Sequence, residues 1–482
     1  MDPDKAYWIK QALSSMNPWW QGGADALDVG GLIPRNALVD LLASVRGELV
    51  TSLTGPRQVG KTTMLRQCAR ALIEDDGVPP RNILLIDFDT PYLTAGLERP
   101  LNDLFEVYSS SILGRDIAAG PERVYVVLDE VCGLPEWERV VKGWQDRHAP
   151  VKFVISDSSM TALGRGQGKS LTGRVAIDRL GPATLADWVK LGGAVPDLPD
   201  LRGPRERFIR ALGTGDSAMA VAALREAHSA LYPMMIEIRS SLEDYLVWGG
   251  YPGIVALGPR ERAARLKDIV DLTLLRDVAG ANDIREVGLL RDFTSLICRQ
   301  TAGLLSLTNI SKELGRDRWI LSRFLDHLVE AGVVQLSYQY TGPYRSSARK
   351  ERKVHVAAPG FANEMAAALD PKAILDGGRA SLLAESVASV HLLTLEGGHI
   401  GLWGRAPRFW RHQGAEVDIV IEVGGIAVPI EVKYGKWAGA RRGVEEFMDR
   451  WHAPLGIVAH MGEIDLEPPV LEVPLWLLLM LC

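Results

Sequence analysis

The chain has 482 residues, a length at which roughly three domains are expected. Hydrophobic residues make up 47% and charged residues 24%, which is typical of an ordinary soluble globular chain with ample material for a core. The formal net charge of −6 argues against a molecule coated in positive charge, so any nucleic-acid contact must come from a local basic patch.

The cysteines lie far apart and form no C-x-x-C pair: Cys68, Cys132, Cys298 and Cys482. Neither a zinc site nor a disulfide framework is indicated, and a reducing cytoplasm fits this pattern best. Residues 1–10 show no secretory signal, and the apolar tail 474–482 is too short to span a bilayer. We therefore expect a cytoplasmic protein without membrane contact, whose tail closes the core as a strand.

Residues 1–47 are expected to be helical. Three tryptophans, Trp8, Trp19 and Trp20, supply large apolar side chains in this segment. Such anchors predict that the segment docks on a neighbouring domain.

A phosphate-binding loop is the strongest motif of the sequence, and it matches the pattern G-x-x-x-x-G-K-[ST]. It comprises Gly55, Pro56, Arg57, Gln58, Val59, Gly60, Lys61, Thr62 and Thr63. Residues 48–54 alternate as a strand does, and residues 64–72 follow with helical periodicity. The glycines let backbone N–H groups turn toward phosphate oxygens, and the helix N-terminus adds partial positive charge. We expect Lys61 to reach the β- and γ-phosphates of ATP and Thr62 to hold Mg2+.

Three further apolar runs read as buried strands: residues 82–87, 124–130 and 151–156. The second run ends in two carboxylates. Asp129 is expected to bind Mg2+ through water, and Glu130 to polarise the attacking water. Ser156, at the polar end of the next strand, is a candidate sensor of the γ-phosphate. Strands that alternate with helices around a phosphate loop imply a parallel sheet with nucleotide at its carboxyl edge, which is an ATPase core.

Two stretches after the sensor strand invite a nucleotide role. Residues 164–170 look like a second phosphate loop, but Leu163 stands where the pattern demands glycine, so we interpret them as a loop. Arg174 is a cation that could reach the γ-phosphate in its own subunit or in the next one. A surface salt bridge is the competing interpretation of Arg174.

The order of motifs resembles a large group of bacterial and archaeal AAA-type ATPases. The resemblance rests on GPRQVGKTTML, LDEV followed by Trp137, ISDSS, LTGR and YLVWGGYPGIV at residues 245–255. It runs from about residue 48 to the end, and members carry a C-terminal region usually filed as a domain of unknown function. Asp157 departs from the glycine usual in the group. By analogy, the resemblance implies a homo-oligomer.

A winged helix is predicted at residues 284–357. Apolar residues at 321, 324, 325 and 328 form one stripe of its second helix, and Arg316, Arg318 and Arg323 stay off that stripe. A basic hairpin follows with Arg345, Arg349, Lys350, Arg352 and Lys353. The hairpin and second helix predict contact with DNA, and a pure packing module is an equally open alternative. The Asp frequent in the family is replaced by Ala358.

The last segment resembles the PD-(D/E)XK nuclease core. Asp418 lies on one strand, and Glu431 and Lys433 lie on the next, joined by a turn at residues 422–427. The two carboxylates suit Mg2+, and metal and lysine together could activate water against a phosphodiester. Glu385, in an expected helix at 382–393, matches the family's upstream acidic residue and would complete the metal site.

We therefore predict an α/β chain with a P-loop parallel-sheet ATPase core followed by a helical lid, a winged helix and an α/β restriction-endonuclease-like domain. The predicted segments are 1–47, 48–190, 191–283, 284–357 and 358–482. One hypothesis is a Mg2+-dependent ATPase coupled to DNA binding and nucleolytic processing. The alternative is an ATP-dependent switch that binds DNA or a protein partner and whose nuclease-like domain is catalytically silent.

Overall fold

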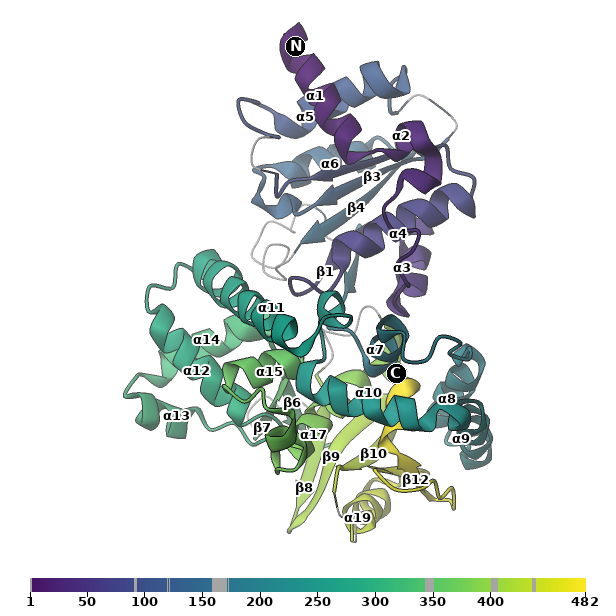
Figure 1. The fold of residues 1–482 in the computed structure, drawn as a ribbon, viewed down its shortest axis with the longest axis vertical. Helices are drawn as coiled ribbons and strands as arrows, with labels where there is room; N and C mark the ends of the chain where they lie inside the picture. The colour runs from purple at the N-terminus through teal and green to yellow at the C-terminus, as the bar shows by residue number, and fades with distance from the viewer. Residues whose placement is uncertain are drawn as a thin grey trace. The chain divides into compact units, whose positions relative to one another are not determined.

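The computed structural model describes residues 2–90, 93–118, 120, 122–157, 171, 173–342, 351–399, 406–435 and 439–482. Contacts divide the chain into two compact units (Figure 1). The first holds Met1–Gly55 and Gly60–Leu180, and the second holds Pro56–Val59 and Gly181–Cys482. The predicted segments 191–283, 284–357 and 358–482 thus all lie within the second unit.

The first unit is built on a parallel sheet, five-stranded over the described residues, with the strand order β2-β3-β4-β1-β5. Its strands are β1 (Val50–Thr54), β2 (Ile83–Asp87), β3 (Val124–Asp129), β4 (Val151–Asp157) and β5 (Val175–Arg179). The first four are the predicted apolar runs, since a parallel sheet is covered on both faces. The edge strand β5 was not predicted, because its side chains are only partly buried.

Helices cover both faces of this sheet. Phe153 of β4 contacts Phe105 of α5, whereas Val154 lines a small space with Leu65 and Cys68 of α4. Adjacent strand residues point to opposite faces, so α5 and α4 lie on opposite sides. The helices are α1 (Pro3–Met16), α2 (Trp19–Gly22), α3 (Ala37–Arg46), α4 (Lys61–Glu74), α5 (Pro100–Tyr108) and α6 (Trp137–Asp146).

The N-terminal segment is helical as predicted, and it docks on the first sheet of its own unit. Trp19 and Trp20 are buried, and both indole N–H groups donate to the carbonyl of Ile83 at the start of β2, at 3.1 and 2.8 Å. Trp20 also stacks on Tyr108 of α5. Trp8 is 41% exposed, so the prediction that it is an anchor is wrong.

The second unit combines helices with a mixed sheet that is seven-stranded in the described ranges and has the order β12-β11-β10-β9-β8-β6-β7. Its strands are β6 (Val334–Gln339), β7 (Arg352–Val356), β8 (Arg408–His412), β9 (Ala415–Val423), β10 (Ile426–Lys433), β11 (Gly456–His460) and β12 (Val470–Pro474). Strands β6 and β7, which lie in the predicted winged helix, join this sheet through β8. The predicted winged helix and nuclease-like segments therefore share one sheet.

Long helices pack around this sheet (Figure 1). They are α7 (Leu185–Gly192), α8 (Arg202–Thr214), α9 (Ser217–Leu231), α10 (Met235–Trp248), α11 (Pro259–Leu272), α12 (Val287–Arg299), α13 (Leu307–Leu314), α14 (Arg318–Glu330), α17 (Arg379–His391) and α19 (Arg441–Trp451). Shorter ones are α15 (Pro359–Met365), α16 (Pro371–Leu375), α18 (Thr394–Gly397) and α20 (Leu475–Met480). The buried stripe predicted for α14 is confirmed, because Leu321, Phe324, Leu325 and Leu328 are all buried.

The C-terminal tail is a buried helix, α20, so the prediction of a closing strand there is wrong. Strand β12 ends just before it, and the unbroken apolar run 475–481 buries every side chain. A helix that is apolar all round belongs in a core. Nowhere in the part of the chain that the structure describes is a helix long and apolar enough to cross a membrane.

Strands β9 and β10 form a hairpin that sets the register of the predicted acidic pair. Val423 pairs with Ile426, so the connection has two residues, Gly424 and Gly425, with φ of 58° and 84°. Positive φ at both positions is the geometry of a type I′ hairpin turn, which favours glycine. The predicted turn at 422–427 is confirmed, and it places Asp418 beside Glu431.

Candidate functional site

The phosphate loop connects β1 to the start of α4 as the sequence predicts. Gly60 caps α4 with φ of 96°, in the left-handed region that favours glycine. A Cβ on Gly55 would overlap the carbonyl oxygen of Leu180, which follows β5. Both glycines of the motif are therefore required by the backbone, and the N-terminus of α4 is free of a side-chain cap.

Four predicted residues converge at the carboxyl edge of the first sheet. The ammonium group of Lys61 donates to the carbonyl of Gly55 at 2.9 Å. The hydroxyl of Thr62 donates to Oδ2 of Asp129 at 2.6 Å, and the hydroxyl of Ser156 donates to Oδ1 of the same carboxylate. Asp129 is buried, and each of its two carboxylate oxygens accepts a hydrogen bond from a neutral hydroxyl group.

The strand register explains this convergence. Asp129 at the end of β3 pairs with Asp87 of β2 on one side and with Ser156 of β4 on the other. Parallel strands end at one edge, where open α/β sheets bind ligands. Burial and the nearby Asp129 raise the pKa of Asp87, a second carboxyl group at this edge.

Glu130 adopts an unusual backbone conformation, with φ of 54°. Non-glycine residues in the left-handed region cost on the order of 1 to 3 kcal/mol and cluster at functional sites. The turn carries the half-buried Glu130 away from the strand immediately after Asp129. Its role in polarising water stays a prediction that this local geometry favours.

The oxygen atoms of Thr62 and Asp129 suit Mg2+. They are hard ligands that already lie 2.6 Å from each other, and Mg2+ in nucleotide sites uses one or two protein oxygens together with phosphates and water. The fit rests on the chemistry of these two groups and on their convergence.

The structure does not bring Arg174 to this edge of the sheet within the chain. The carbonyl of Arg174 accepts from the N–H of Val50, at the amino end of β1. The length of β1, at about 3.3 Å per residue, separates it from the loop by roughly 15 Å. The Arg174 side chain instead pairs with Asp146. Within one subunit, Arg174 therefore forms a salt bridge, as the competing interpretation of the sequence has it. Its action on the γ-phosphate in a neighbouring subunit stays a prediction.

Arg57, another loop residue, has its own ion pair. Its guanidinium donates to Asp277 at 2.6 Å, and both residues belong to the second unit by contacts. Asp277 lies in a π-helical segment, Thr273–Ala279. Arg57 is therefore held by a carboxylate in this structure.

The second predicted site gathers on β9, β10 and α17. The N–H of Asp418 donates to Glu431 at 3.2 Å, and the N–H of Val432 donates back to Asp418 at 3.0 Å. Lys433 lies 3.3 Å from Asp418 and 2.5 Å from Glu431. Helix α17 packs on β7 and β10 and brings Glu385 to the same cluster. The predicted grouping of these four side chains is therefore what the structure shows.

A fifth residue, Lys353 of β7, lies among the carboxylates. Its Nζ is 2.8 Å from Glu385, 2.8 Å from Glu416 and 3.8 Å from Asp418. The sequence predicts Lys353 on an exposed basic hairpin, and that prediction is wrong, because its side chain is only 5% exposed. The hairpin residues Arg345, Arg349 and Lys350 lie outside the described residues.

Burial and charge perturb the titration of this cluster. Burial, followed by the repulsion of Asp418, raises the pKa of Glu385 to about 8 and that of Glu431 to about 7. Burial lowers the pKa of Lys353, but Glu385, Asp418 and Glu416 outweigh it, so the pKa is raised. Lys433 is raised for the same reason by Asp418 and Glu431. Both lysines thus remain charged at neutral pH.

The metal-binding role predicted for these side chains stays a prediction. Across the described ranges, no three His, Cys, Asp or Glu side chains are arranged to hold a metal ion. The ammonium group of Lys353 lies 2.8 Å from Glu385 and 3.8 Å from Asp418, two of the three carboxylates that were expected to meet a cation. The binding of Mg2+ by Glu385, Asp418 and Glu431 therefore stays a prediction, and Lys353 is an ammonium group that the prediction did not include.

Comparison with known proteins supports the first site. Residues 48–188 match the family described as AAA domain, and residues 239–372 match a domain of unknown function (DUF8612). The chain therefore contains an AAA-type P-loop ATPase domain. The DUF8612 match covers the predicted winged helix at 284–357 and describes no function for it. The winged-helix interpretation and the nuclease-like interpretation of residues 358–482 therefore stay predictions.

Two similar proteins are described as uncharacterized, and a similar solved structure is a Walker-type ATPase. An uncharacterized protein of Haemophilus influenzae is 19% identical over 311 residues, and the alignment covers 63% of this chain and 66% of that protein. An uncharacterized protein of Mycobacterium tuberculosis is 23% identical over 445 residues, with 91% of this chain and 83% of that protein covered. A Walker-type ATPase of Pyrococcus abyssi has a TM-score of 0.35 at 13% identity, covering 69% of this chain and 98% of that one.

Sequence reasoning missed three residues at these sites. Asp87 ends a predicted strand and pairs with Asp129 in the sheet. The signal available in the sequence was that both predicted strands end in an acidic residue. Arg179 ends β5 beside Thr54, next to the phosphate loop, but β5 itself was not predicted. Lys353 carried no signal of its role, because its partner Glu385 is 32 residues away in the chain.

Proposed function

We propose that the protein is a Mg2+-dependent ATP hydrolase. The observation that carries the proposal is the convergence of Lys61, Thr62, Asp129 and Ser156 at the carboxyl edge of the parallel sheet. Backbone glycines, a lysine, a hydroxyl group and a buried carboxylate are the groups that phosphoryl transfer from a nucleotide requires. The AAA domain match over residues 48–188 supports it.

Each residue has a distinct part in this proposal. Lys61 exchanges the carbonyl of Gly55 for phosphate oxygens and stabilises their negative charge. Thr62 and Asp129 hold Mg2+, which supplies charge neutralisation when it is bound. Ser156 fixes the orientation of Asp129, and Glu130 accepts a hydrogen bond from the attacking water and draws away its proton.

Glu130→Gln tests this assignment. The amide cannot accept the proton, so we expect ATP to bind with similar affinity while steady-state hydrolysis falls by ~100-fold or more. Glu136→Gln is the matched control, because Glu136 also has positive φ but is exposed and paired with Arg139. Normal hydrolysis by Glu130→Gln, or an equal loss in both variants, would contradict the assignment.

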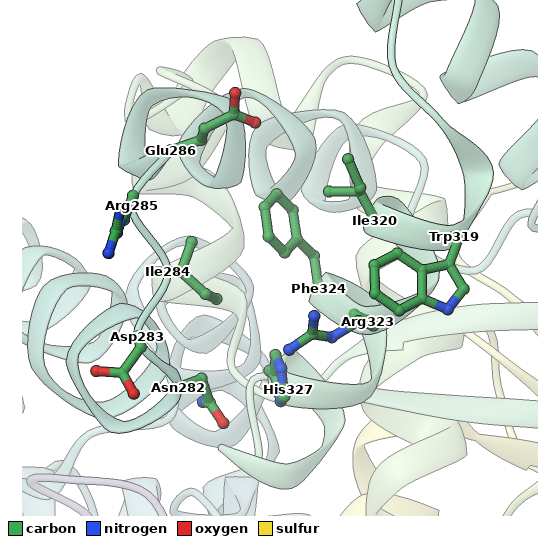
Figure 2. A pocket seen from close by; sticks show the side chains of 10 residues that line it. All are labelled: Asn282, Asp283, Ile284, Arg285, Glu286, Trp319, Ile320, Arg323, Phe324 and His327. Carbon is green, nitrogen blue, oxygen red and sulfur yellow. The ribbon is translucent and has the colours of Figure 1, made fainter.

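We further propose that the second unit binds DNA through α13 and α14. Figure 2 shows the start of α14, where Trp319 and Arg323 border a pocket of about 250 Å³ that also exposes Arg285. Trp319 is 68% exposed, and the Arg323 guanidinium lies 5.0 Å from its ring. An exposed aromatic ring flanked by arginines is typical of nucleic-acid contact surfaces. Arg318, at the first turn of α14, is also exposed.

Duplex DNA binding at several salt concentrations, measured by fluorescence anisotropy, tests this second proposal. We expect Arg323→Ala to weaken binding and to lower the slope of log affinity against log salt by about one, as loss of one phosphate contact does. Arg260→Ala, an exposed arginine on α11, is the control and should leave the slope unchanged. Absence of binding by the wild-type chain would favour a packing module that receives a protein partner.

A further inference from the structure

The cation at the centre of the acidic cluster is part of the chain. Lys353 contacts Glu385 and Glu416 at 2.8 Å each, and its Nζ lies 5.4 Å from the centre of the Phe409 ring. Its backbone is fixed on both sides, because it pairs with Ser337 of β6 and bridges to Leu304. The lysine is therefore held by strand pairing, two ion pairs and an aromatic ring.

The carboxylate oxygens that a metal would need are already in use. Oδ2 of Asp418 accepts from the N–H of Val432 and from Lys433. One oxygen of Glu431 accepts from the N–H of Asp418, and the other lies 2.5 Å from Lys433. Glu385 is engaged by Lys353. Each of these buried acceptors is satisfied without a metal, as buried polar groups generally are.

A divalent ion and Lys353 cannot share this position. Mg2+ requires near-octahedral oxygen ligands at 2.0–2.1 Å, which is closer than the 2.8 Å that separates the ammonium group from its carboxylates. Both cations would also repel each other at low dielectric. Entry of a metal would require the removal of a buried, strand-anchored lysine.

We propose that Lys353 is a resident cation that takes the place of the divalent metal in the nuclease-like centre, so that this centre binds no metal and cleaves no phosphodiester. The cluster then serves as a structural core that joins β7, β9, β10 and α17. The proposal does not rest on the ATPase assignment, and it makes the second unit a surface that engages a partner without cutting it.

Mn2+ binding to the full chain without nucleotide tests the proposal. Wild type and Asp418→Asn are titrated with Mn2+, and free ion is measured by electron paramagnetic resonance, so that sites elsewhere cancel in the comparison. We expect both proteins to bind the same number of ions. One more ion bound by the wild type, with or without added duplex DNA, overturns the proposal.

Lys353→Met supplies the converse test, because methionine keeps the volume and removes the charge. We expect the folded variant to gain one Mn2+ site per chain, and that site to disappear in Lys353→Met/Asp418→Asn. Arg411→Met is the matched control: Arg411 pairs with the same Glu416 at 3.3 Å but is 43% exposed, and it should gain no site. A folded Lys353→Met variant without a new Mn2+ site overturns the proposal. If that variant does not fold, the Mn2+ titration of wild type against Asp418→Asn decides.

Cleavage assays give an independent outcome. Linear, circular and single-stranded DNA are incubated with wild type and either Mg2+ or Mn2+, and we expect no products. Cleavage that is lost in Asp418→Asn refutes the proposal. ATP hydrolysis measured in the same preparations reports separately on the first site, so failure of one proposal is distinguishable from failure of the other.

Discussion

Replacement of Lys353 by methionine should destabilise the second unit strongly and in a pH-dependent way. The side chain is 5% exposed and makes two ion pairs at 2.8 Å. Removal of one partner from a buried ion pair costs about 3–5 kcal/mol, because the remaining charge is left without compensation. Arg411→Met removes an exposed partner of the same Glu416 and should cost ~0–1 kcal/mol.

The pH dependence follows from the carboxyl groups. Glu385 has a pKa of about 8 in the folded state, above its ordinary value of 4.5, so its contribution to stability is fully present below pH 4.5 and is lost as the pH rises toward 8. Glu431 acts in the same direction up to about pH 7. Without Lys353 the charged form of Glu385 is less favourable still, so the variant should go on losing stability above about pH 8, where the wild type has already lost this contribution.

Hydrogen exchange read by mass spectrometry measures this effect where it occurs. The difference in protection between wild type and Lys353→Met should change little between pH 5 and pH 7 and should grow by ~1.4 kcal/mol per pH unit above about pH 8 in peptides from α17 and β7. Peptides from β1 and β3 in the first unit serve as an internal control. A difference in protection that does not grow between pH 8 and pH 9 would refute the account of this cluster.

Three further predictions concern the first unit. Trp19→Ala should destabilise it by about 3–5 kcal/mol in urea unfolding, whereas Trp8→Ala, at an exposed site, should change stability by less than about 0.5 kcal/mol; equal losses would contradict the docking described for these helices. Ser156→Ala should lower Mg2+-dependent hydrolysis by on the order of 10-fold, because Asp129 loses a donor that orients it, and Ser52→Ala should have no effect. Mixing Arg174→Ala with Glu130→Gln subunits should restore ATP turnover if Arg174 acts across an interface, and a mixture as inactive as its parts would rule that role out.

The nucleotide site was predictable because its signals are local. The loop is a contiguous motif, and β1 to β4 are buried on both faces, which makes them continuous apolar runs in the sequence. Strand β5 was not predictable in this way, because it lies at the sheet edge and Ile177 is exposed between two half-buried residues. The position of Arg174 was likewise hidden, since it depends on where β5 begins.

The acidic cluster could be predicted only in part, because it also depends on contacts between distant segments of the chain. The hairpin could be predicted, since its turn glycines and alternating strands fix Asp418 against Glu431. The basic pair Arg352 and Lys353 gives no hint in the sequence that the side chain of its second residue, Lys353, turns inward. Its burial follows from the pairing of β7 with β6 and from the packing of α17, which are contacts between distant segments.

The most direct test of the central claim is a calorimetric titration of ATP with Mg2+ into the wild-type chain and into Lys61→Ala. The account predicts saturable binding of about one nucleotide per chain by the wild type and loss of that binding in the variant, because Lys61 carries the positive charge at the phosphate loop. No binding by the wild type, or equal binding by both proteins, would contradict it.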